Sequence, residues 1–454
     1  MDSTRARQAA RNISRGTQRA AGKLLGVFVR ALSSNAFVRS ALVLLLLVTF
    51  LFARGDRMGL SAAAAASTRH EYGLISWELF NFLDKWAYRV NLAAPWTSDG
   101  ETHRREKLDR YLELAVHLRD AQGSLDRVSA TSAAQSEAIV AAQRDVDRLV
   151  AERNSLRNIV EEYLESEVSR TLSEYGFGGS FLWPPVDFRL DNPPSVLVVS
   201  PRNVIERRET VLVDPETSVT EMENLEARLL LEEDVSAVVL RTGGLASYPT
   251  VISSNRDLLG LLEVASHEWM HAYLFFHPLG RSFFSGGEMV TFNETLADMF
   301  GREVGRVTYN RITGEHVEPV VAPTRPRDGE PGDQGVFEFN RFMHDTRVRA
   351  DELLEHGEIE SAEAYMEERR ATLAEEHGIF IRKLNQAYFA FTGSYGESGG
   401  SVSPLPFQLW EVREKSGGLT GLVRAVEGIT SIREFEALLT EFEISIEAWE
   451  SGFG

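Results

Sequence analysis

Residues 266–271 read Ser266-His267-Glu268-Trp269-Met270-His271, an H-E-x-x-H pattern with an apolar run on each side. On a helix, positions four apart share one face, so His267 and His271 would project side by side. Two imidazoles at that spacing can hold one zinc ion, and Glu268 can reach a water molecule on the metal. The pattern therefore predicts a metal-binding helix. A buried helix with two hydrogen-bonded histidines is the plainer alternative.

A zinc ion held by two histidines needs a third protein ligand if one coordination position is to stay open for water. The stretch 291–300 predicts a second helix, on which Glu294 and Asp298 lie one turn apart on a shared face. We predict Glu294 as the third ligand and Asp298 as the carboxylate that accepts the free N–H of a ligating histidine. Glu288, in a glycine-flanked loop, is the rival third ligand, and His277 is expected to be structural.

The composition limits which side chains could bind a metal ion and which class of partner is expected. The chain has 454 residues, no cysteine and a formal net charge of −19. Without cysteine there are no disulfides and no thiolate ligands, so a metal must be held by histidine and carboxylate. Basic residues are concentrated in the first 40 positions, and the body that follows is strongly acidic. An acidic body argues against nucleic acid as a partner.

The N-terminus predicts an association with a membrane. An apolar run over 40–53 follows a basic tail, residues 1–35. The run is 14 residues long, whereas a spanning helix needs about 20 residues. It can extend over 36–58 if Arg39 reaches the lipid headgroups. We expect either a retained single-pass anchor with a cytoplasmic N-terminus, or a signal peptide cleaved near 62–66 and a secreted protein. Both place the catalytic part outside the cytoplasm.

Residues 71–176 predict a long helical region. The aromatic, amphipathic stretch 71–92 is expected either to lie at the bilayer surface or to pack on the globular body. Residues 102–175 contain no proline, and apolar residues over 139–163 follow the 3-4 spacing of a coiled coil. Gly123 interrupts the earlier half, so the region could form one long rod or a helical hairpin. The region is either a stalk that forms a homo-oligomer or a pair of helices packed against the catalytic body.

The remainder, 190–454, is expected to form the catalytic domain. Two proline pairs, at 184–185 and 193–194, mark its start, and short β-rich runs and one helix follow. The expected strands are 195–200, 210–214, 237–242 and 248–253, with a helix near 220–232. The last of these strands contains Pro249, which predicts an edge strand where an extended peptide could bind.

The C-terminal part is expected to be helical. Residues 318–335 are rich in proline, glycine and charge, and predict a mobile loop. Helices are expected over 336–355, 359–376 and 379–391, with shorter helices over 404–439.

With H-E-x-x-H at 267–271 and N-E-x-x-x-D at 293–298, the chain resembles the gluzincin zinc metallopeptidases. More narrowly, it is similar over about 195–439 to the bacterial putative aminopeptidase family. The segments that carry this similarity are 243–250, the 267–271 helix, 292–294, 384–395 and 404–407. The resemblance implies an α+β, zincin-like catalytic domain with a small β-sheet, active-site helices and a helical C-terminal part. The membrane anchor and the helical region would precede it.

The resemblance also implies roles for individual residues. Zn²⁺ would be bound by His267, His271 and Glu294, with Glu268 as the general base. A tyrosine would stabilise the oxyanion, and Tyr388 and Tyr395 are both candidates.

These features predict a membrane-anchored zinc peptidase that acts on peptides or proteins. The alternative is a non-catalytic, membrane-tethered scaffold with a structural or vestigial zinc site. Structural zinc sites usually have four protein ligands, and the sequence offers three, which favours the catalytic form. The substrate, and the choice between endopeptidase and aminopeptidase, stay open.

Overall fold

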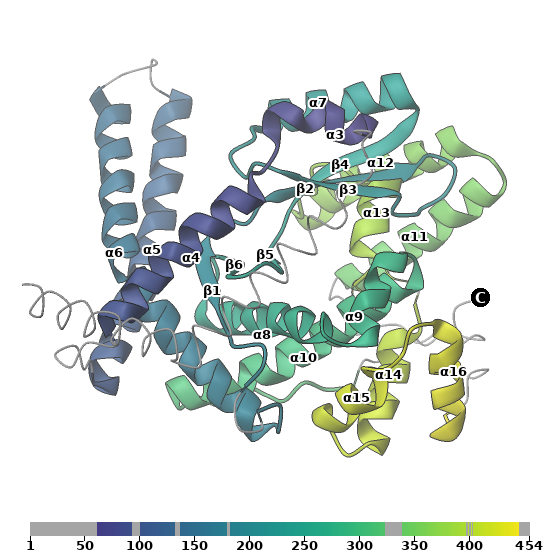
Figure 1. The fold of residues 1–454 in the computed structure, drawn as a ribbon. Helices are drawn as coiled ribbons and strands as arrows, with labels where there is room; N and C mark the ends of the chain where they lie inside the picture. Colours follow the sequence, from purple (N-terminus) through teal and green to yellow (C-terminus); the bar gives the residue numbers. More distant parts are fainter. Residues whose placement is uncertain are drawn as a thin grey trace, which may run out of the picture.

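A computed structural model of the chain describes residues 61–92, 100–131, 137–178, 182–322, 338–395, 398, 401 and 403–444. The predicted α+β class is confirmed, because the described part combines many helices with two three-stranded sheets (Figure 1). The strands are β1 (Phe188–Asp191), β2 (Ser195–Pro201), β3 (Glu209–Val213), β4 (Val235–Arg241), β5 (Gly244–Leu245) and β6 (Thr250–Ser253). The N-terminal helices are α3 (Ala62–Ser67), η1 (Thr68–His70), α4 (Leu74–Leu92), α5 (Glu101–Thr131), α6 (Glu137–Glu174) and α7 (Val219–Glu233). The later helices are α8 (Leu258–Leu274), α9 (Pro278–Ser282), η2 (Phe283–Ser285), α10 (Glu288–Thr313), α11 (Phe339–Glu355), α12 (Ile359–His377), α13 (Gln386–Thr392), α14 (Leu405–Lys415), α15 (Leu419–Val426) and α16 (Ile432–Glu441).

The first sheet is antiparallel, with β2 between β3 and β4. Alternate residues of a strand point to opposite faces. Leu197 and Val199 pack against α7 and α3, whereas Val196 and Val198 pack against α13. Both faces of this sheet are therefore covered by helices, which explains why the sequence of β2 is a continuous apolar run.

The second sheet has the order β1-β6-β5, and β1 runs parallel to β6. The prediction that 248–253 forms an edge strand is wrong. Strand β6 is central because β1, which lies between the two proline pairs, adds to its outer side. Pro249 precedes the strand, so its missing N–H interrupts no ladder. The edge of this sheet is β5, which starts directly after Gly243.

Helices α8 and α10 lie side by side below the sheets (Figure 1). Glycines permit their close contact. A Cβ at Gly301 would lie 2.7 Å from the carbonyl oxygen of Glu263, and a Cβ at Gly305 would lie 2.7 Å from the Glu263 Cα. A larger residue at either position would force the two helices apart. The close contact brings the second half of α8 against the first half of α10.

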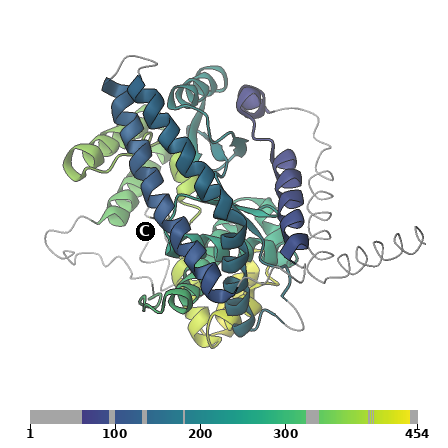
Figure 2. The same ribbon diagram turned by 90° about the vertical axis from the view of Figure 1, so that its left-hand side faces the viewer.

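Helices α5 and α6 form an antiparallel hairpin that runs along one side of the molecule (Figure 2). Helix α5 continues through Gly123, and the connection over 132–136 lies outside the described residues. Val146 and Leu149 of the predicted seam pack on α5, while Val160 and Tyr163 join the core around α8 and α10. The region is therefore a helical hairpin rather than one long rod, and its two helices pack against the body.

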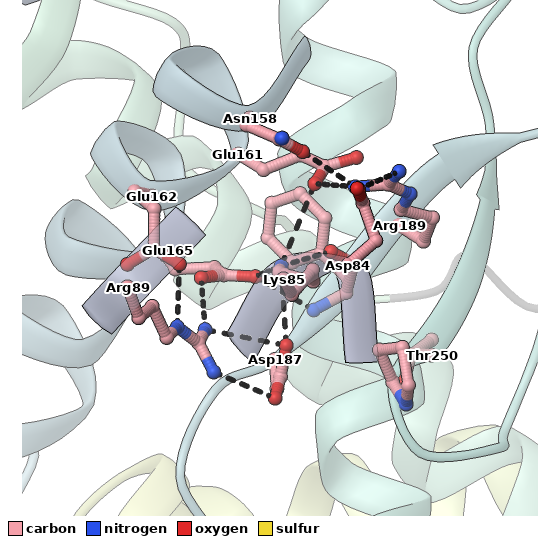
Figure 3. A network of polar contacts seen from close by, with 12 residues as sticks. Asp84, Lys85, Arg89, Asn158, Glu161, Glu162, Glu165, Asp187, Arg189 and Thr250 are labelled. Carbon is pink, nitrogen blue, oxygen red and sulfur yellow. Dashed lines mark hydrogen bonds and ion pairs between the residues drawn. The ribbon is translucent and has the colours of Figure 1, made fainter. Parts of the chain in front are cut away.

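Helix α4 contacts the body through charged side chains (Figure 3). Lys85 is buried and forms ion pairs with Glu165, with Asp187 at 3.1 Å and with Glu161 at 3.6 Å. Arg89, one turn later, binds Glu165 at 2.9 Å and Asp187 at 3.0 Å. The network joins α4 to α6 and to β1. Truncating one partner of such a buried network leaves an unpaired charge, so the network fixes the position of α4.

The opposite face of α4 is apolar and exposed. Its exposed side chains are Ile75, Leu79, Phe80 and Leu83. Helix α4 therefore packs on the body, as one of the two alternatives for 71–92 predicts, but it does so with its apolar face outward.

Several predictions concern residues that the structure does not describe. The basic tail 1–35, the apolar segment 36–58 and residues 323–335 of the predicted loop lie outside the described residues. Across the described ranges, no helix combines the length and the apolar character needed to cross a membrane. Helices α11 and α12 lie where helices were predicted, but α13 begins at Gln386 rather than near 379, because Asn385 caps it through Tyr388 N–H.

Candidate metal centre

Helix α8 carries the H-E-x-x-H motif and is fixed at its start and along its core face. The Asp257 side chain accepts a hydrogen bond from Gly260 N–H at 2.9 Å, which satisfies a backbone donor of the first turn. Trp269 and Met270 are buried in the main core. Because that face is held in the core, His267 and His271 project from the adjacent face into a cavity.

Helix α10 brings the second motif to the same place. Asn293 is buried, and its side-chain amide donates to the carbonyl groups of Leu279 and Met289 at 3.0 and 2.8 Å. The bond to Leu279 ties the start of α10 to α9. Glu294 and Asp298 then lie one turn apart on the face of α10 that contacts α8.

The two histidines and Glu294 converge on one point. His267 Nε2 and His271 Nε2 are 3.1 Å apart, and they lie 3.6 and 3.5 Å from Glu294 Oε2. A tetrahedral zinc ion with bonds of about 2.0–2.1 Å separates its ligand atoms by about 3.4 Å. The three side chains fit that spacing without rearrangement. Within the described ranges, they form the single group of three or more potential ligand side chains.

Asp298 determines the orientation of His267. Its Oδ1 lies 3.0 Å from His267 Nδ1, so that nitrogen donates a hydrogen bond to the carboxylate. Nε2 of a neutral His267 would then present a lone pair toward the carboxylate of Glu294, and two acceptors repel each other. A second proton on His267 or a cation resolves this conflict. A divalent metal ion would take the place of that proton.

The pKa shifts of His267 and Glu294 also indicate that a positive charge is favoured between these two side chains. Burial by itself would lower the pKa of His267, but hydrogen bonds to Asp298 and Glu294 raise this pKa well above its usual value. Burial by itself would raise the pKa of Glu294, but His271 and His267 hold it well below its usual value. The site is built for an anionic carboxylate beside a positive centre.

Glu268 is buried next to the metal-binding side chains, and it lines the same cavity. Burial raises its pKa, while His267 and His271 oppose the rise. Gly244 of the edge strand β5 lies directly beside it: a Cβ at Gly244 would be 2.6 Å from Glu268 Oε1. The carboxylate therefore lies between the metal site and the open edge of β5.

The structure separates the two candidate tyrosines. Tyr395 lines the cavity, and its ring centroid is 6.5 Å from that of His267. The charge of Glu294, together with burial, raises the pKa of Tyr395 well above its usual value, so the phenol keeps its proton and can donate a hydrogen bond. Tyr388 instead packs against the apolar residues of β2 and β4 and does not line the cavity.

The two remaining sequence candidates lie elsewhere. Glu288 is exposed at the first position of α10 and does not line the cavity. His277 stacks on Tyr273 with ring centroids 4.4 Å apart, and its Nδ1 lies 3.6 Å from Glu427 Oε2. Its contacts are those of a structural residue.

The cavity has a volume of about 730 Å³, and its lining includes residues of β5, α8, η2 and α10 and two residues of α4, Leu74 and Glu78. Sequence analysis missed Glu78. Burial raises the pKa of Glu78 to about 7, while its hydrogen bond from Tyr248 N–H acts in the opposite direction. A signal was present in the sequence: Glu78 is the single charged residue between Leu74 and Leu83. Arg207 also lines the cavity, and its guanidinium lies 5.9 Å from the ring centroid of Phe283.

No protein-family model, curated protein or solved structure matches this chain significantly.

Proposed function

We propose that the protein is a zinc-dependent peptidase of the gluzincin type with a zincin-like catalytic domain. The observation that carries the proposal is the convergence of three ligand atoms at tetrahedral spacing in a cavity that also contains Glu268 and Tyr395. His267, His271 and Glu294 would hold the ion with three protein ligands, the number usual for a catalytic zinc site.

The chain supplies the acid–base and hydrogen-bonding groups that peptide hydrolysis needs. When bound, zinc acts as a Lewis acid that lowers the pKa of a water molecule to about 7. Glu268 accepts a proton from the attacking water and passes it to the departing amine. Tyr395 donates a hydrogen bond to the oxygen of the scissile carbonyl as it gains negative charge. Asp298 holds His267 in the orientation that leaves Nε2 free for the metal.

The substrate peptide is proposed to bind along β5. Among the described strands, β5 pairs with β6 alone, and Gly244 to Ser247 line the cavity. An extended peptide can add to such an edge through its backbone groups. Because Gly244 lies against Glu268, a peptide on β5 has its backbone beside the general base.

The scaffold alternative requires a closed or inactive site. A structural zinc ion usually has four protein ligands. The described residues provide three, and the space beside them is an open cavity rather than a fourth side chain. These observations favour the peptidase.

We further propose that the protein is held at the cell membrane by residues 36–58, with its catalytic domain outside the cytoplasm; secretion after cleavage is the alternative. The basic tail supports this topology, and the exposed apolar face of α4 suits contact with a bilayer surface. Alkaline carbonate extraction and N-terminal sequencing test the proposal. Retention in the membrane with an intact N-terminus supports an anchor, whereas release and an N-terminus beyond residue 58 indicate secretion.

A peptide-library assay tests the catalytic proposal. Purified protein is incubated with mixed peptides, with and without a chelator, and the products are identified by mass spectrometry. We expect cleavage that the chelator abolishes and that added zinc restores. The cleavage positions distinguish an endopeptidase from an aminopeptidase. A zinc-loaded protein that cleaves no peptide would contradict the proposal.

A further inference from the structure

Three arginines in the lining of the cavity have no acidic partner. They are Arg207, just before β3, Arg241, at the end of β4, and Arg256, just before α8. Arg207 is half-buried, and the other two are exposed. Across the described residues, no carboxylate forms an ion pair with any of the three. Their positive charge is therefore available to a ligand that enters the cavity.

The lack of partners is unusual for this protein. Other partly buried arginines are paired: Arg202 Nη2 lies 2.8 Å from Glu363 Oε2, and Arg306 Nε lies 3.3 Å from Glu263 Oε1. Acids also outnumber bases in the chain, which has a formal net charge of −19. Unpaired arginines that share one cavity in an acidic protein indicate a place for a carboxylate from outside.

The acids of the same cavity do not neutralise the three arginines. Those in the lining are Glu78, Glu263, Glu268, Glu294 and Asp298. The last three surround the proposed metal position, and Glu263 is paired with Arg306. Glu78 is only 2% exposed, and its Oε1 accepts a hydrogen bond from Tyr248 N–H. The cavity therefore has separate acidic and basic parts.

Arg207 lies on the side of the cavity that holds the metal ligands. Its guanidinium is 5.9 Å from the ring centroid of Phe283, at the distance of a cation–π contact. The Phe283 ring stands edge-on to His271, with centroids 6.2 Å apart. The guanidinium is thus within about 12 Å of the His271 ring, which is the length of about four residues of extended chain.

Arg241 and Arg256 lie at the start of the edge strand β5. A Cβ at Gly243 would collide with the guanidinium of Arg256. A Cβ at the next residue, Gly244, would be 2.6 Å from Glu268 Oε1. Because consecutive Cα atoms are 3.8 Å apart, the guanidinium of Arg256 lies within about 12 Å of the general base. A side chain of a peptide on β5 would therefore pass close to Arg256.

We propose that the cavity selects peptides with an acidic side chain within about four residues of the scissile bond, and that Arg207, Arg241 and Arg256 bind this carboxylate. The inference rests on the proposed function, since it names the class of peptide that the site cleaves. A guanidinium binds a carboxylate through two parallel N–H···O bonds. A cleft lined by such groups also attracts anionic ligands before they bind, and this attraction weakens as salt is added.

Paired peptides test the selection. A peptide that the wild type cleaves is blocked at both ends, and Glu is compared with Gln at each of the four positions on either side of the scissile bond. We expect Glu to raise kcat/KM about tenfold or more in at least one position at low salt. Arg207→Gln, Arg241→Gln or Arg256→Gln should abolish this preference, and Arg207→Lys or Arg256→Lys should restore part of it. Arg208→Gln is the matched control, because Arg208 is exposed and does not line the cavity.

Three results would overturn the assignment. The first is equal cleavage of the Glu and Gln peptides at every position. The second is a preference for Glu that all three glutamine variants keep. The third is a preference for anionic peptides that appears only when the C-terminus is free, because the arginines would then bind the terminal carboxylate rather than a side chain.

A binding measurement separates this inference from the peptidase proposal. A fluorescently labelled peptide rich in Glu and its Gln counterpart are titrated into Glu268→Gln and into the double variants that add Arg207→Gln or Arg256→Gln. None of these proteins is expected to hydrolyse peptide, so affinity is read without turnover. Equal affinity for the two peptides would overturn the inference even if the wild type cleaves peptides. An arginine-dependent preference for the Glu peptide, without cleavage by the wild type, would support the anionic subsite and contradict only the peptidase.

Discussion

Gly244 and Glu268 lie so close that a side chain at Gly244 would collide with the carboxylate: a Cβ there would be 2.6 Å from Glu268 Oε1 and 3.0 Å from Val264 Cγ1. Gly244 belongs to the exposed edge of the second sheet, and Glu268 belongs to the metal-binding helix. The contact joins the proposed peptide-binding edge to the proposed general base. It explains why the smallest residue is needed at this position.

The variant Gly244→Ala should lose activity without losing zinc. The atom that the new methyl group would meet is the end of a flexible side chain, so Glu268 would be displaced while the fold is kept. A displacement of about 1 Å costs about a hundredfold in rate. Peptide cleavage and zinc content are measured together. Gly428→Ala is the matched control, because a Cβ at Gly428 meets no atom within 4 Å. Equal activity of the two variants would count against a substrate path along β5.

Asp298→Ala should weaken zinc binding by about 10–100-fold, because His267 would lose the carboxylate that holds its Nδ1–H. Competition with a chromogenic chelator gives the affinity. Glu288→Ala is the control, since Glu288 is exposed at the start of α10. If both variants bind zinc like the wild type, Asp298 does not support the ligand.

Tyr395→Phe should lower kcat by about 10²–10³-fold with little change in KM, since a hydrogen bond to the oxyanion acts in the transition state. Tyr388→Phe should behave like the wild type, because Tyr388 lies among the apolar residues of the first sheet. Steady-state kinetics on one good substrate test both. A large loss of kcat in Tyr388→Phe, with none in Tyr395→Phe, would reverse the assignment.

Glu78 should make stability fall as pH rises. Its pKa is raised from 4.5 to about 7 in the folded protein, so the folded state holds this proton more tightly than the unfolded chain does between those values. The folded state is therefore favoured at low pH, and this advantage is lost as pH rises through about 7. Glu78→Gln should be more stable than the wild type by up to about 3 kcal/mol at about pH 8, and little different at about pH 5. Urea unfolding across this range measures the difference. Parallel pH profiles for the two proteins would show that Glu78 is not a desolvated carboxylate.

The metal site could be predicted from sequence because its parts are local. His267, Glu268 and His271 lie within five positions of each other, and Glu294 and Asp298 share one face of the next long helix. Helical periodicity fixes such relationships before any tertiary contact is known. The choice of Glu294 over Glu288 followed from the same periodicity, and the structure places Glu294 beside the histidines.

The contacts that could not be predicted from the sequence join segments that are far apart in the chain. Strand β1 pairs with β6 across a long stretch of chain, so local patterns could not show that β6 is central. The four-residue β1 lies between two proline pairs and resembles a linker. Helix α4 buries Lys85 and half-buries Arg89, while Ile75, Leu79, Phe80 and Leu83 are exposed, so much of its apolar surface faces outward, unlike that of a usual amphipathic helix. For that reason its one acid in the cavity, Glu78, was not among the predicted site residues.

The measurement that tests the account most directly combines zinc content and peptide cleavage for the wild type and for Glu268→Gln. Glutamine keeps the size of the side chain and leaves His267, His271 and Glu294 unchanged. We predict one zinc ion per chain in both proteins, and cleavage by the wild type alone, with a loss in Glu268→Gln of at least about a hundredfold. A wild type that binds no zinc, or a Glu268→Gln protein that cleaves peptides as fast as the wild type, would contradict the account.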